Sequence, residues 1–173
     1  MKKIIFLETT EKEKEILQKY PDFLKKVDFS SEKLSFKNAQ KFKDYEVVSI
    51  FIGSQLSKEI LNQLSNLKFI ATRSTGFDHI DLDYCREHNI LTASVPSYGA
   101  HTVAEYTFGL LLCLVRKIYT AYHRVRENGS FSLEGLEGEE LFGKTLGVIG
   151  TGHIGREVIK IAKGFSIKVI AYD

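Results

Sequence analysis

The sequence of 173 residues predicts an α/β protein with parallel sheets, and three observations support this prediction. Short apolar runs alternate with amphipathic segments over residues 1–100, which is typical of a parallel sheet covered by helices on both faces. A long helical pattern then fills residues 101–128. Residues 146–173 finally read as apolar run, glycine-rich turn, amphipathic helix and second apolar run, which is the order of a βαβ unit.

The first domain, residues 1–100, is predicted to be flavodoxin-like with five strands. The expected strands are Ile4–Leu7, Val27–Phe29, Val47–Ile52, Leu67–Thr72 and Ile90–Ala93, of which Val27–Phe29 is the weakest. The expected helices are Glu11–Lys19, Asn38–Phe42, Ser57–Leu64 and Leu82–His88. Ser57 and Asp81 stand where N-caps would close two of these helices. Pro21 lies outside every expected element.

Residues 101–128 are expected to form one helix that joins two domains. Thr102 and Glu105 have the spacing of a capping box, and apolar side chains follow along one broad face. Such a helix would be about 42 Å long at 1.5 Å per residue. The segment 129–143 is rich in glycine and is expected to be a loop. Residues 129–173 would then begin a Rossmann dinucleotide-binding domain that is truncated after its first βαβ unit.

Composition excludes several classes of protein. The hydrophobic fraction of 43% and the charged fraction of 27% are ordinary for a soluble globular chain. A net charge of +2 gives no electrostatic reason to expect nucleic-acid binding. No apolar run reaches the length of a signal peptide or a membrane span, so we expect a cytoplasmic protein. Cys85 and Cys113 have no metal or redox spacing and are expected to be reduced thiols.

The glycine-rich turn has the pattern G-x-G-x-x-G. Gly150 would allow a tight turn, Gly152 would let the backbone approach a pyrophosphate, and Gly155 would let the helix pack close to the sheet. The backbone N–H groups of His153 and Ile154 would then lie at the positive end of a helix. The same glycines could serve packing alone, but the flanking strand, helix and acid favour a dinucleotide site.

Asp173 closes the second apolar run, 18 positions after Gly155. A carboxylate at about this spacing accepts hydrogen bonds from both ribose hydroxyls and repels a 2′-phosphate, so it favours NAD over NADP. A polar residue at a strand end with no such role is the alternative interpretation.

The loop from Arg73 to Asp81 directly follows an expected strand. Ligands of open parallel sheets bind beyond the carboxyl ends of the strands, and Gly76 could bring backbone N–H groups against a carboxylate. From the pattern alone an ordinary turn is the favoured interpretation, since glycine occurs in most loops. The acids of this region lack the spacing of a calcium loop, so no metal is expected. No catalytic residue is assigned, because no local acid–base or nucleophile pair is present.

Four stretches resemble the NAD-dependent D-isomer-specific 2-hydroxyacid dehydrogenases, and among these most closely the D-lactate dehydrogenases. They are Arg73–Asp81, Val95–Tyr98, Val103–Glu105 and Gly138–Gly155. The resemblance implies an oxidoreductase with a substrate domain followed by an NAD domain. It also implies reversible hydride transfer between NAD(H) and a small 2-hydroxy or 2-oxo acid, with D-lactate and pyruvate as first choice. Members of the family are commonly homodimers.

The resemblance also implies roles for particular residues. The backbone of Thr75 and Gly76 would hold the substrate carboxylate, with Thr75 close to the nicotinamide, and Tyr98 would line the substrate pocket. His153 and Ile154 would meet the pyrophosphate, where the family more often has arginine in place of His153. A second departure is Gly99, where lactate-type members usually have serine. Asp173 would meet the adenosine ribose.

The family's catalytic arginine, glutamate and histidine lie downstream of the first dinucleotide unit. None of the three has a counterpart in this sequence, and neither Arg73 nor His79 is assigned in their place. The chain is therefore expected to be an inactive N-terminal portion of the enzyme. A non-enzymatic NAD-sensing or corepressor-like scaffold of the same fold is the alternative.

Overall fold

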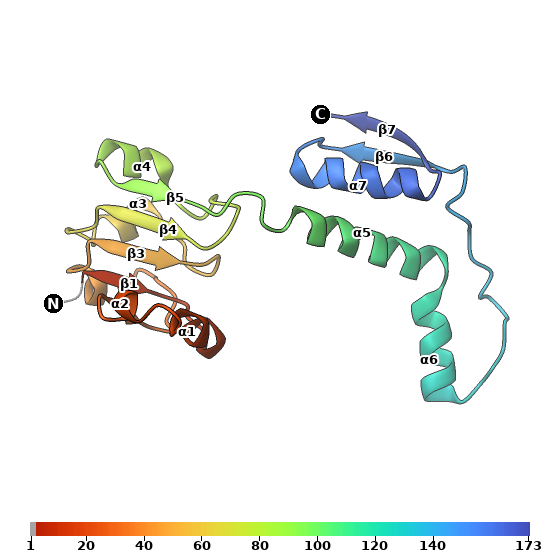
Figure 1. Cartoon of the computed structure of the whole chain (residues 1–173), viewed down its shortest axis with the longest axis horizontal. Helices are drawn as coiled ribbons and strands as arrows, with labels where there is room; N and C mark the ends of the chain where they lie inside the picture. Colours follow the sequence, from red (N-terminus) through yellow and green to blue (C-terminus); the bar gives the residue numbers. More distant parts are fainter. Residues whose placement is uncertain (1–2) are drawn as a thin grey trace. The chain divides into compact units, whose positions relative to one another are not determined.

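A computed structural model describes residues 3–173, which form two compact units that divide between Tyr98 and Gly99 (Figure 1). Residues 1 and 2, which the sequence assigns to the first domain, lie outside the described part. Within residues 3–173, no helix is both long enough and apolar enough to cross a bilayer.

The first unit is built on a five-stranded sheet in which every paired strand is parallel. The strands are β1 (Ile4–Phe6), β2 (Val27–Phe29), β3 (Val47–Ile50), β4 (Phe69–Thr72) and β5 (Leu91–Ala93). Their spatial order is β2-β1-β3-β4-β5, and Figure 1 shows β1, β3, β4 and β5 following one another across the sheet. This order is that of flavodoxin-like folds, so the predicted fold class is confirmed.

The core of the first unit lies on this sheet, because aliphatic side chains of the central strands are fully buried. Val48, Ile50 and Ile70 have no measurable exposure. Buried strands read as nearly continuous apolar runs, which explains why β3 was easily located in the sequence, whereas the residues of β5 are all exposed. The packed sheet therefore fixes the positions of the carboxyl ends of β1, β3 and β4.

The helices of the first unit are shorter than the sequence predicts. They are α1 (Glu11–Leu17), α2 (Pro21–Leu24), the 3₁₀ helix η1 (Ala39–Phe42), α3 (Lys58–Leu61) and α4 (Leu82–Glu87). The placement of Pro21 outside every element is wrong, because Pro21 is the first residue of α2. Proline suits this position, since its missing N–H would have no partner in the first turn of a helix.

The caps of these helices are partly as predicted. Asp81 caps α4 by accepting a hydrogen bond from the N–H of Tyr84 at 2.9 Å, as the sequence indicates. Ser57 stands at the N-cap of α3, but its hydroxyl donates to Glu59 and caps no backbone group. A capping box that the sequence analysis missed joins Thr10 and Glu13 at the start of α1.

The second unit holds the predicted βαβ unit behind two helices. Its elements are α5 (Ala100–Val115), α6 (Ile118–Asn128), β6 (Thr145–Ile149), α7 (His153–Gly164) and β7 (Lys168–Tyr172). Strands β6 and β7 pair in parallel, and α7 makes the crossover between them. Figure 1 shows α7 between the two strands and α5.

The prediction of one helix over residues 101–128 is wrong. The chain breaks between α5 and α6, where Lys117 adopts a left-handed conformation with φ of 55°. At this break the N–H of Glu139 donates to the carbonyl of Val115 at 2.9 Å. Gly138 lies so close that a Cβ on it would be 2.5 Å from the same carbonyl oxygen. A segment remote in sequence therefore satisfies the end of α5.

The predicted capping box of Thr102 and Glu105 is also wrong. Helix α5 begins at Ala100 with Gly99 at its N-cap, and no side chain caps it. The first helical bond runs from the N–H of Val103 to the carbonyl of Gly99 at 2.9 Å. Thr102 and Glu105 therefore lie inside the helix, past the positions where their side chains could cap its start.

The core of the second unit joins one face of α7 to α5 and to one face of the small sheet. Buried Ala104 and Phe108 of α5 belong to one cluster with Val148 and Val158. The opposite face of the sheet is open. Ile149 is 90% exposed and Ile170 is 67% exposed. Alternate residues of a strand point to opposite faces, so both lie on the face away from Val148.

Candidate functional site

The sequence predicts ligand-binding residues in two places, and the structure puts each at the carboxyl end of a parallel strand. One set lies in the loop that follows β4 in the first unit. The other lies in the turn that follows β6 in the second unit. Open parallel sheets bind ligands at this end of their strands.

The loop after β4 is tied to the segment that follows β5. The hydroxyl of Thr75 donates to the carbonyl of Val95 at 2.9 Å. The N–H of Val95 donates in turn to the carbonyl of Ser74 at 3.0 Å. Because β4 and β5 pair side by side, the segments that leave them can hold each other in place.

Buried hydroxyl groups hold the same loop from within. Thr72 and Ser74 are 2% and 4% exposed, and their Oγ atoms are 2.6 Å apart. The hydroxyl of Ser74 donates to the carbonyl of Gly76 at 2.7 Å. His79 Nε2 lies 3.1 Å from Thr72 Oγ1. The sequence analysis missed these contacts, because a Ser or Thr beside a glycine carries no distinct signal.

Thr75 and Gly76 offer two adjacent backbone donors. Neither N–H group finds an acceptor among residues 3–173, and both residues are exposed. A Cβ placed on Gly76 would meet only Asp78 Oδ2, at 3.9 Å, so the space over this peptide is open. Exposed backbone N–H groups without an internal acceptor are open to water, which an anionic ligand can replace. Two neighbouring N–H groups left open at a strand end are therefore suited to an anion such as a carboxylate.

Arg73 precedes these donors but faces the interior of the first unit. Its guanidinium donates to the carbonyls of Leu7 at 2.9 Å and Glu8 at 3.2 Å, and to the Ser49 hydroxyl at 3.1 Å. Its Nε lies 3.2 Å from a carboxylate oxygen of Glu13. Arg73 therefore joins the ends of β1, β3 and β4, which leaves it no role as a substrate ligand.

The carboxylate of Glu13 responds to this environment. Burial raises the pKa of Glu13, but the backbone N–H and hydroxyl of Thr10 and the charge and hydrogen bond of Arg73 together lower it below its usual value. Both members of the ion pair are thus charged at neutral pH.

Tyr98 lies at the end of the segment that follows β5, and its side chain is 64% exposed. The same segment carries Val95, which binds the loop of Thr75. The predicted substrate residues Thr75, Gly76 and Tyr98 therefore lie in two segments that contact each other, although within residues 3–173 no hydrogen bond joins Tyr98 to the other two.

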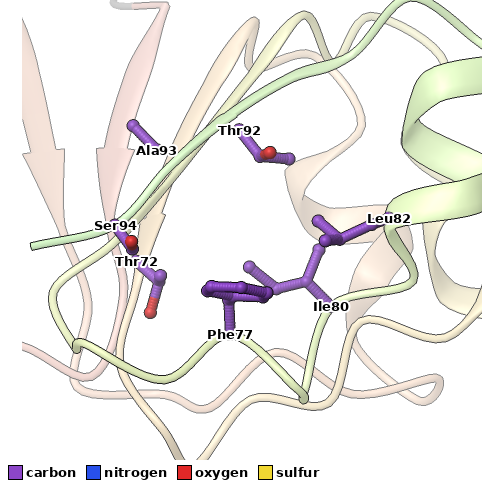
Figure 2. Close-up of a pocket in the computed structure, with 7 residues that line it drawn as sticks. All are labelled: Thr72, Phe77, Ile80, Leu82, Thr92, Ala93 and Ser94. Carbon is purple, nitrogen blue, oxygen red and sulfur yellow. The ribbon is translucent and has the colours of Figure 1, made fainter. Parts of the chain in front are cut away.

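A small pocket lies beside the loop and was not predicted. It encloses about 180 Å³ and is lined by Thr72, Phe77, Ile80, Leu82, Thr92, Ala93 and Ser94. Figure 2 shows Phe77, Ile80 and Leu82 on one side, with Thr92 and Ala93 of β5 on the other. Its lining is mainly apolar, so it offers shape more than charge.

In the second unit, the glycine turn has the geometry that its pattern predicts. Gly150 has a φ of 92°, and its N–H donates to the carbonyl of Tyr172 at 2.7 Å. A Cβ on Gly155 would lie 2.0 Å from the carbonyl oxygen of Gly150, so only glycine fits there. A Cβ on Gly152 would meet nothing within 4 Å, which leaves space beside the backbone.

Helix α7 presents an uncapped N-terminus at this turn. It begins at His153, follows Gly152 as the N-cap, and has no side chain capping its first turn. The first helical bond of the turn runs from the N–H of Arg156 to the carbonyl of Gly152 at 3.0 Å. The N–H groups of His153 and Ile154 are therefore free for a ligand, and the helix dipole favours a phosphate.

Asp173 follows β7, and Thr151 of the turn lies against it. The hydroxyl of Thr151 donates to Oδ2 of Asp173. This hydrogen bond, with one from the Thr151 backbone, lowers the pKa of Asp173. The carboxylate is therefore ionised at neutral pH, as an acceptor for ribose hydroxyls must be. Thr151 was missed, because the x positions of G-x-G-x-x-G carry no residue preference that could mark it.

These features fit the adenosine half of a dinucleotide. The open space over Gly152 and the free N–H groups of α7 suit the pyrophosphate, and the ionised carboxylate at the end of β7 suits the ribose. The chain is thus an α/β protein with a βαβ unit whose turn is suited to a dinucleotide and a separate loop suited to an anion.

Comparison with known proteins gives the family. The sequence model of one protein family, described as D-isomer specific 2-hydroxyacid dehydrogenase, catalytic domain, matches residues 4–142. The chain belongs to this family. The D-lactate dehydrogenase of Escherichia coli is 37% identical over 174 residues, which cover 99% of this chain and 53% of that protein. A 2-hydroxyacid dehydrogenase homolog of Haemophilus influenzae is 46% identical over 130 residues, covering 74% and 39% of the two chains.

The fold is similar to those of solved structures in the same family. The D-lactate dehydrogenase of Aquifex aeolicus, in complex with NAD and lactic acid, has a TM-score of 0.89 and 35% sequence identity. This match covers 98% of the present chain and 51% of that enzyme. The chain thus spans about half the length of the D-lactate dehydrogenases that it matches.

Proposed function

We propose that the chain forms the substrate-binding and first nucleotide-binding parts of an NAD-dependent D-2-hydroxyacid dehydrogenase, with D-lactate and pyruvate as its substrate pair. The observation that carries this proposal is the pair of unsatisfied N–H groups at Thr75 and Gly76, in a loop held on three sides by hydrogen bonds. The D-lactate dehydrogenase relatives support the choice of substrate.

In this proposal each residue binds or orients, and none transfers a proton. Thr75 and Gly76 hold the substrate carboxylate through their N–H groups, with Thr75 also close to the nicotinamide, and Tyr98 lines the substrate pocket. Bound NADH supplies the hydride that reduces the 2-oxo acid. No residue between 3 and 173 is assigned to acid–base catalysis, so we expect residues 1–173 alone not to turn over substrate.

The second unit binds the cofactor in this proposal. Gly150, Gly152 and Gly155 shape the turn, and His153 and Ile154 donate N–H groups to the pyrophosphate. Asp173 accepts the ribose hydroxyls and repels a 2′-phosphate, so NAD is preferred to NADP. We also propose that the enzyme is cytoplasmic and assembles as a homodimer. Analytical ultracentrifugation tests the assembly.

Calorimetric titration with NADH and NADPH tests the cofactor part. We expect NADH to bind more tightly than NADPH. Gly152→Ala should weaken NADH binding without unfolding the unit, because its Cβ meets no protein atom but occupies the space beside the turn. Gly147→Ala in β6 is the matched control, since its Cβ also meets nothing within 4 Å. Absence of NADH binding by the unmodified chain would contradict the proposal.

An assay of NADH oxidation with pyruvate, glyoxylate and hydroxypyruvate tests the remaining part. Residues 1–173 should give the background rate with all three acids. Turnover well above background would show that catalytic groups lie within the described residues. The NAD-sensing scaffold would be favoured instead by two results together. NAD binding would change the association of the chain with a partner, and forms of the protein longer than residues 1–173 would also show no turnover.

A further inference from the structure

Four polar groups form a line that ends at the carbonyl of Gly76, one of the two residues whose N–H groups are the candidate carboxylate donors. His79 Nε2 lies 3.1 Å from Thr72 Oγ1, and Thr72 Oγ1 lies 2.6 Å from Ser74 Oγ. The Ser74 hydroxyl reaches the carbonyl oxygen of Gly76 at 2.7 Å. The line thus connects an imidazole to the residue whose N–H is proposed to hold the substrate.

The protons in this line can point in only one direction. A carbonyl oxygen can only accept a hydrogen bond, so Ser74 must donate its single hydroxyl proton to the carbonyl of Gly76. Ser74 can then only accept a hydrogen bond from Thr72, so the hydroxyl proton of Thr72 must be donated to Ser74. Thr72 can then only accept from His79, so Nε2 of His79 must carry a proton. The neutral Nε2–H tautomer and the imidazolium both meet this condition, whereas the Nδ1–H tautomer does not.

Burial makes the line more than a surface arrangement. Thr72 and Ser74 are 2% and 4% exposed, so water has little access to replace a lost partner. Leaving a buried hydroxyl unsatisfied costs more than a hydrogen bond contributes. The line therefore keeps the Gly76 carbonyl on the buried hydroxyl pair, while the N–H groups of Thr75 and Gly76 stay without an internal acceptor.

We propose that His79 is a positioning residue, which as an Nε2–H donor fixes the shape of the loop that receives the substrate carboxylate. The nature of the ligand rests on the function proposed above, but the direction of the hydrogen bonds does not. The role needs a donor at the position of Nε2 and does not need an imidazole as such.

The tautomer of His79 is the first test. Long-range ¹H–¹⁵N spectra of the imidazole rings, recorded without ligand where the ring is neutral, should show a protonated Nε2 and an unprotonated Nδ1. An unprotonated Nε2 would overturn the inference, whatever the chain binds.

Two substitutions and one control test the positioning. His79→Gln keeps an N–H donor near the position of Nε2, whereas His79→Phe keeps a ring without any donor. His88→Phe is the matched control, because His88 stacks on Tyr84 at 3.8 Å between ring centres and contacts the Tyr84 carbonyl, outside this line. Circular dichroism first verifies that each variant is folded.

The readouts are the amide resonances of Thr75 and Gly76 and the dissociation constant of oxamate, an unreactive isostere of pyruvate. His79→Phe should move both resonances and weaken oxamate by roughly 2- to 10-fold, the range for one hydrogen bond. His79→Gln should restore both, and His88→Phe should change neither. Equal behaviour of the Gln and Phe variants would overturn the inference.

Failure of the proposed function gives a different result. If oxamate did not bind the unmodified chain at these amides, the substrate assignment would be wrong. The hydrogen-bond line would then still be supported by an Nε2–H tautomer together with amide resonances that the Phe variant moves and the Gln variant restores. It would be overturned if the Phe variant left those resonances unchanged.

Discussion

The loop after β4 and the turn after β6 both offer backbone N–H groups to an anion, but opposite means hold them in shape. In the loop, side chains make the hydrogen bonds: Ser74 binds the Gly76 carbonyl, and Thr75 binds the Val95 carbonyl. In the turn, the absence of side chains matters, because Gly155 lies against the Gly150 carbonyl where no Cβ fits. A steric arrangement fails through one added atom, whereas a hydrogen-bonded arrangement fails in steps as partners are removed.

The largest effect is expected from Gly155→Ala, which adds that atom. Its Cβ would lie 2.0 Å from a backbone oxygen, and neither α7 nor β6 can move away without loss of packing. We expect the free energy of unfolding of the second unit to fall by about 3 kcal/mol, as for severe overpacking.

Urea denaturation followed by circular dichroism measures this change. Gly164→Ala at the end of the same helix is the control, because its Cβ meets nothing within 4 Å. The control should be neutral or slightly stabilising, since alanine is the better helix former. Equal stability of the two variants would show that the turn after β6 is not held in shape by the close contact of Gly155 with the Gly150 carbonyl.

Arg73→Met is expected to have the next largest effect. The substitution leaves the carbonyls of Leu7 and Glu8 without their shared donor, and it leaves Glu13 without its cation. We expect a loss of about 2 kcal/mol in the stability of the first unit, since hydrogen bonds from charged donors are among the stronger ones. Arg73→Lys should recover only part, because an ammonium cannot reproduce the planar fork.

Arg86→Met is the matched control in the same unfolding experiment. Its side chain is 75% exposed and makes one ion pair with Asp83 at a spacing of three residues. Such exposed pairs contribute about 0.5 kcal/mol or less. A loss as large as that of Arg73→Met would mean that the network around Arg73 adds nothing beyond a surface charge.

Asp173→Asn is expected to change cofactor choice and to leave the fold intact. The amide cannot accept from both ribose hydroxyls as a carboxylate does, and it no longer repels a 2′-phosphate. The ratio of NADH to NADPH affinity should fall roughly tenfold, the scale of one charge-assisted hydrogen bond. Paired calorimetric titrations measure the ratio, with Asp22→Asn in the first unit as control. An unchanged ratio would exclude Asp173 from ribose binding.

The smallest effect concerns pH. The pKa of Glu13 is lowered from its ordinary value of 4.5, so its contribution to stability is complete above about pH 4.5 and is lost as the pH falls through the lower folded value. The contribution should be below about 1 kcal/mol, because the carboxylate is 38% exposed and screened by solvent.

Glu13→Gln should therefore flatten the decline in unfolding free energy below pH 4.5. Glu15→Gln on the same helix is the control and should leave the slope unchanged. A wild-type slope in the Glu13 variant would show that the Glu13 carboxylate, with its partners Thr10 and Arg73, adds nothing to the stability of the first unit.

The predictability of the two regions differs for the same physical reason. The glycine turn is local: strand, turn, helix and acid follow in one segment, so Gly150, Gly155 and Asp173 could be located from spacing alone. The loop after β4 depends on pairing between strands, and the bond from Thr75 to Val95 exists only because β5 lies beside β4. Such contacts between strands cannot be predicted from a single sequence.

The helices show the same division. The break at Lys117 was missed, because the segment that lies against the end of α5 there, at Gly138, comes from a loop over twenty residues away. The capping box at Thr102 failed for the converse reason. Local spacing was correct, but the helix already begins at Ala100, so those side chains lie too far along it to act as caps.

The position of β1 inside the sheet, between β2 and β3, also sets the order of events during synthesis. β1 is made before its partners, yet it pairs with β2 on one side and with β3 on the other. An emerging chain thus holds an apolar strand with one unpaired edge until Val47–Ile50 has left the ribosome, and chaperones bind such exposed segments. Loss of β1 would divide the sheet between β2 and β3, so deletion of residues 1–6 should give a product without a folded first unit.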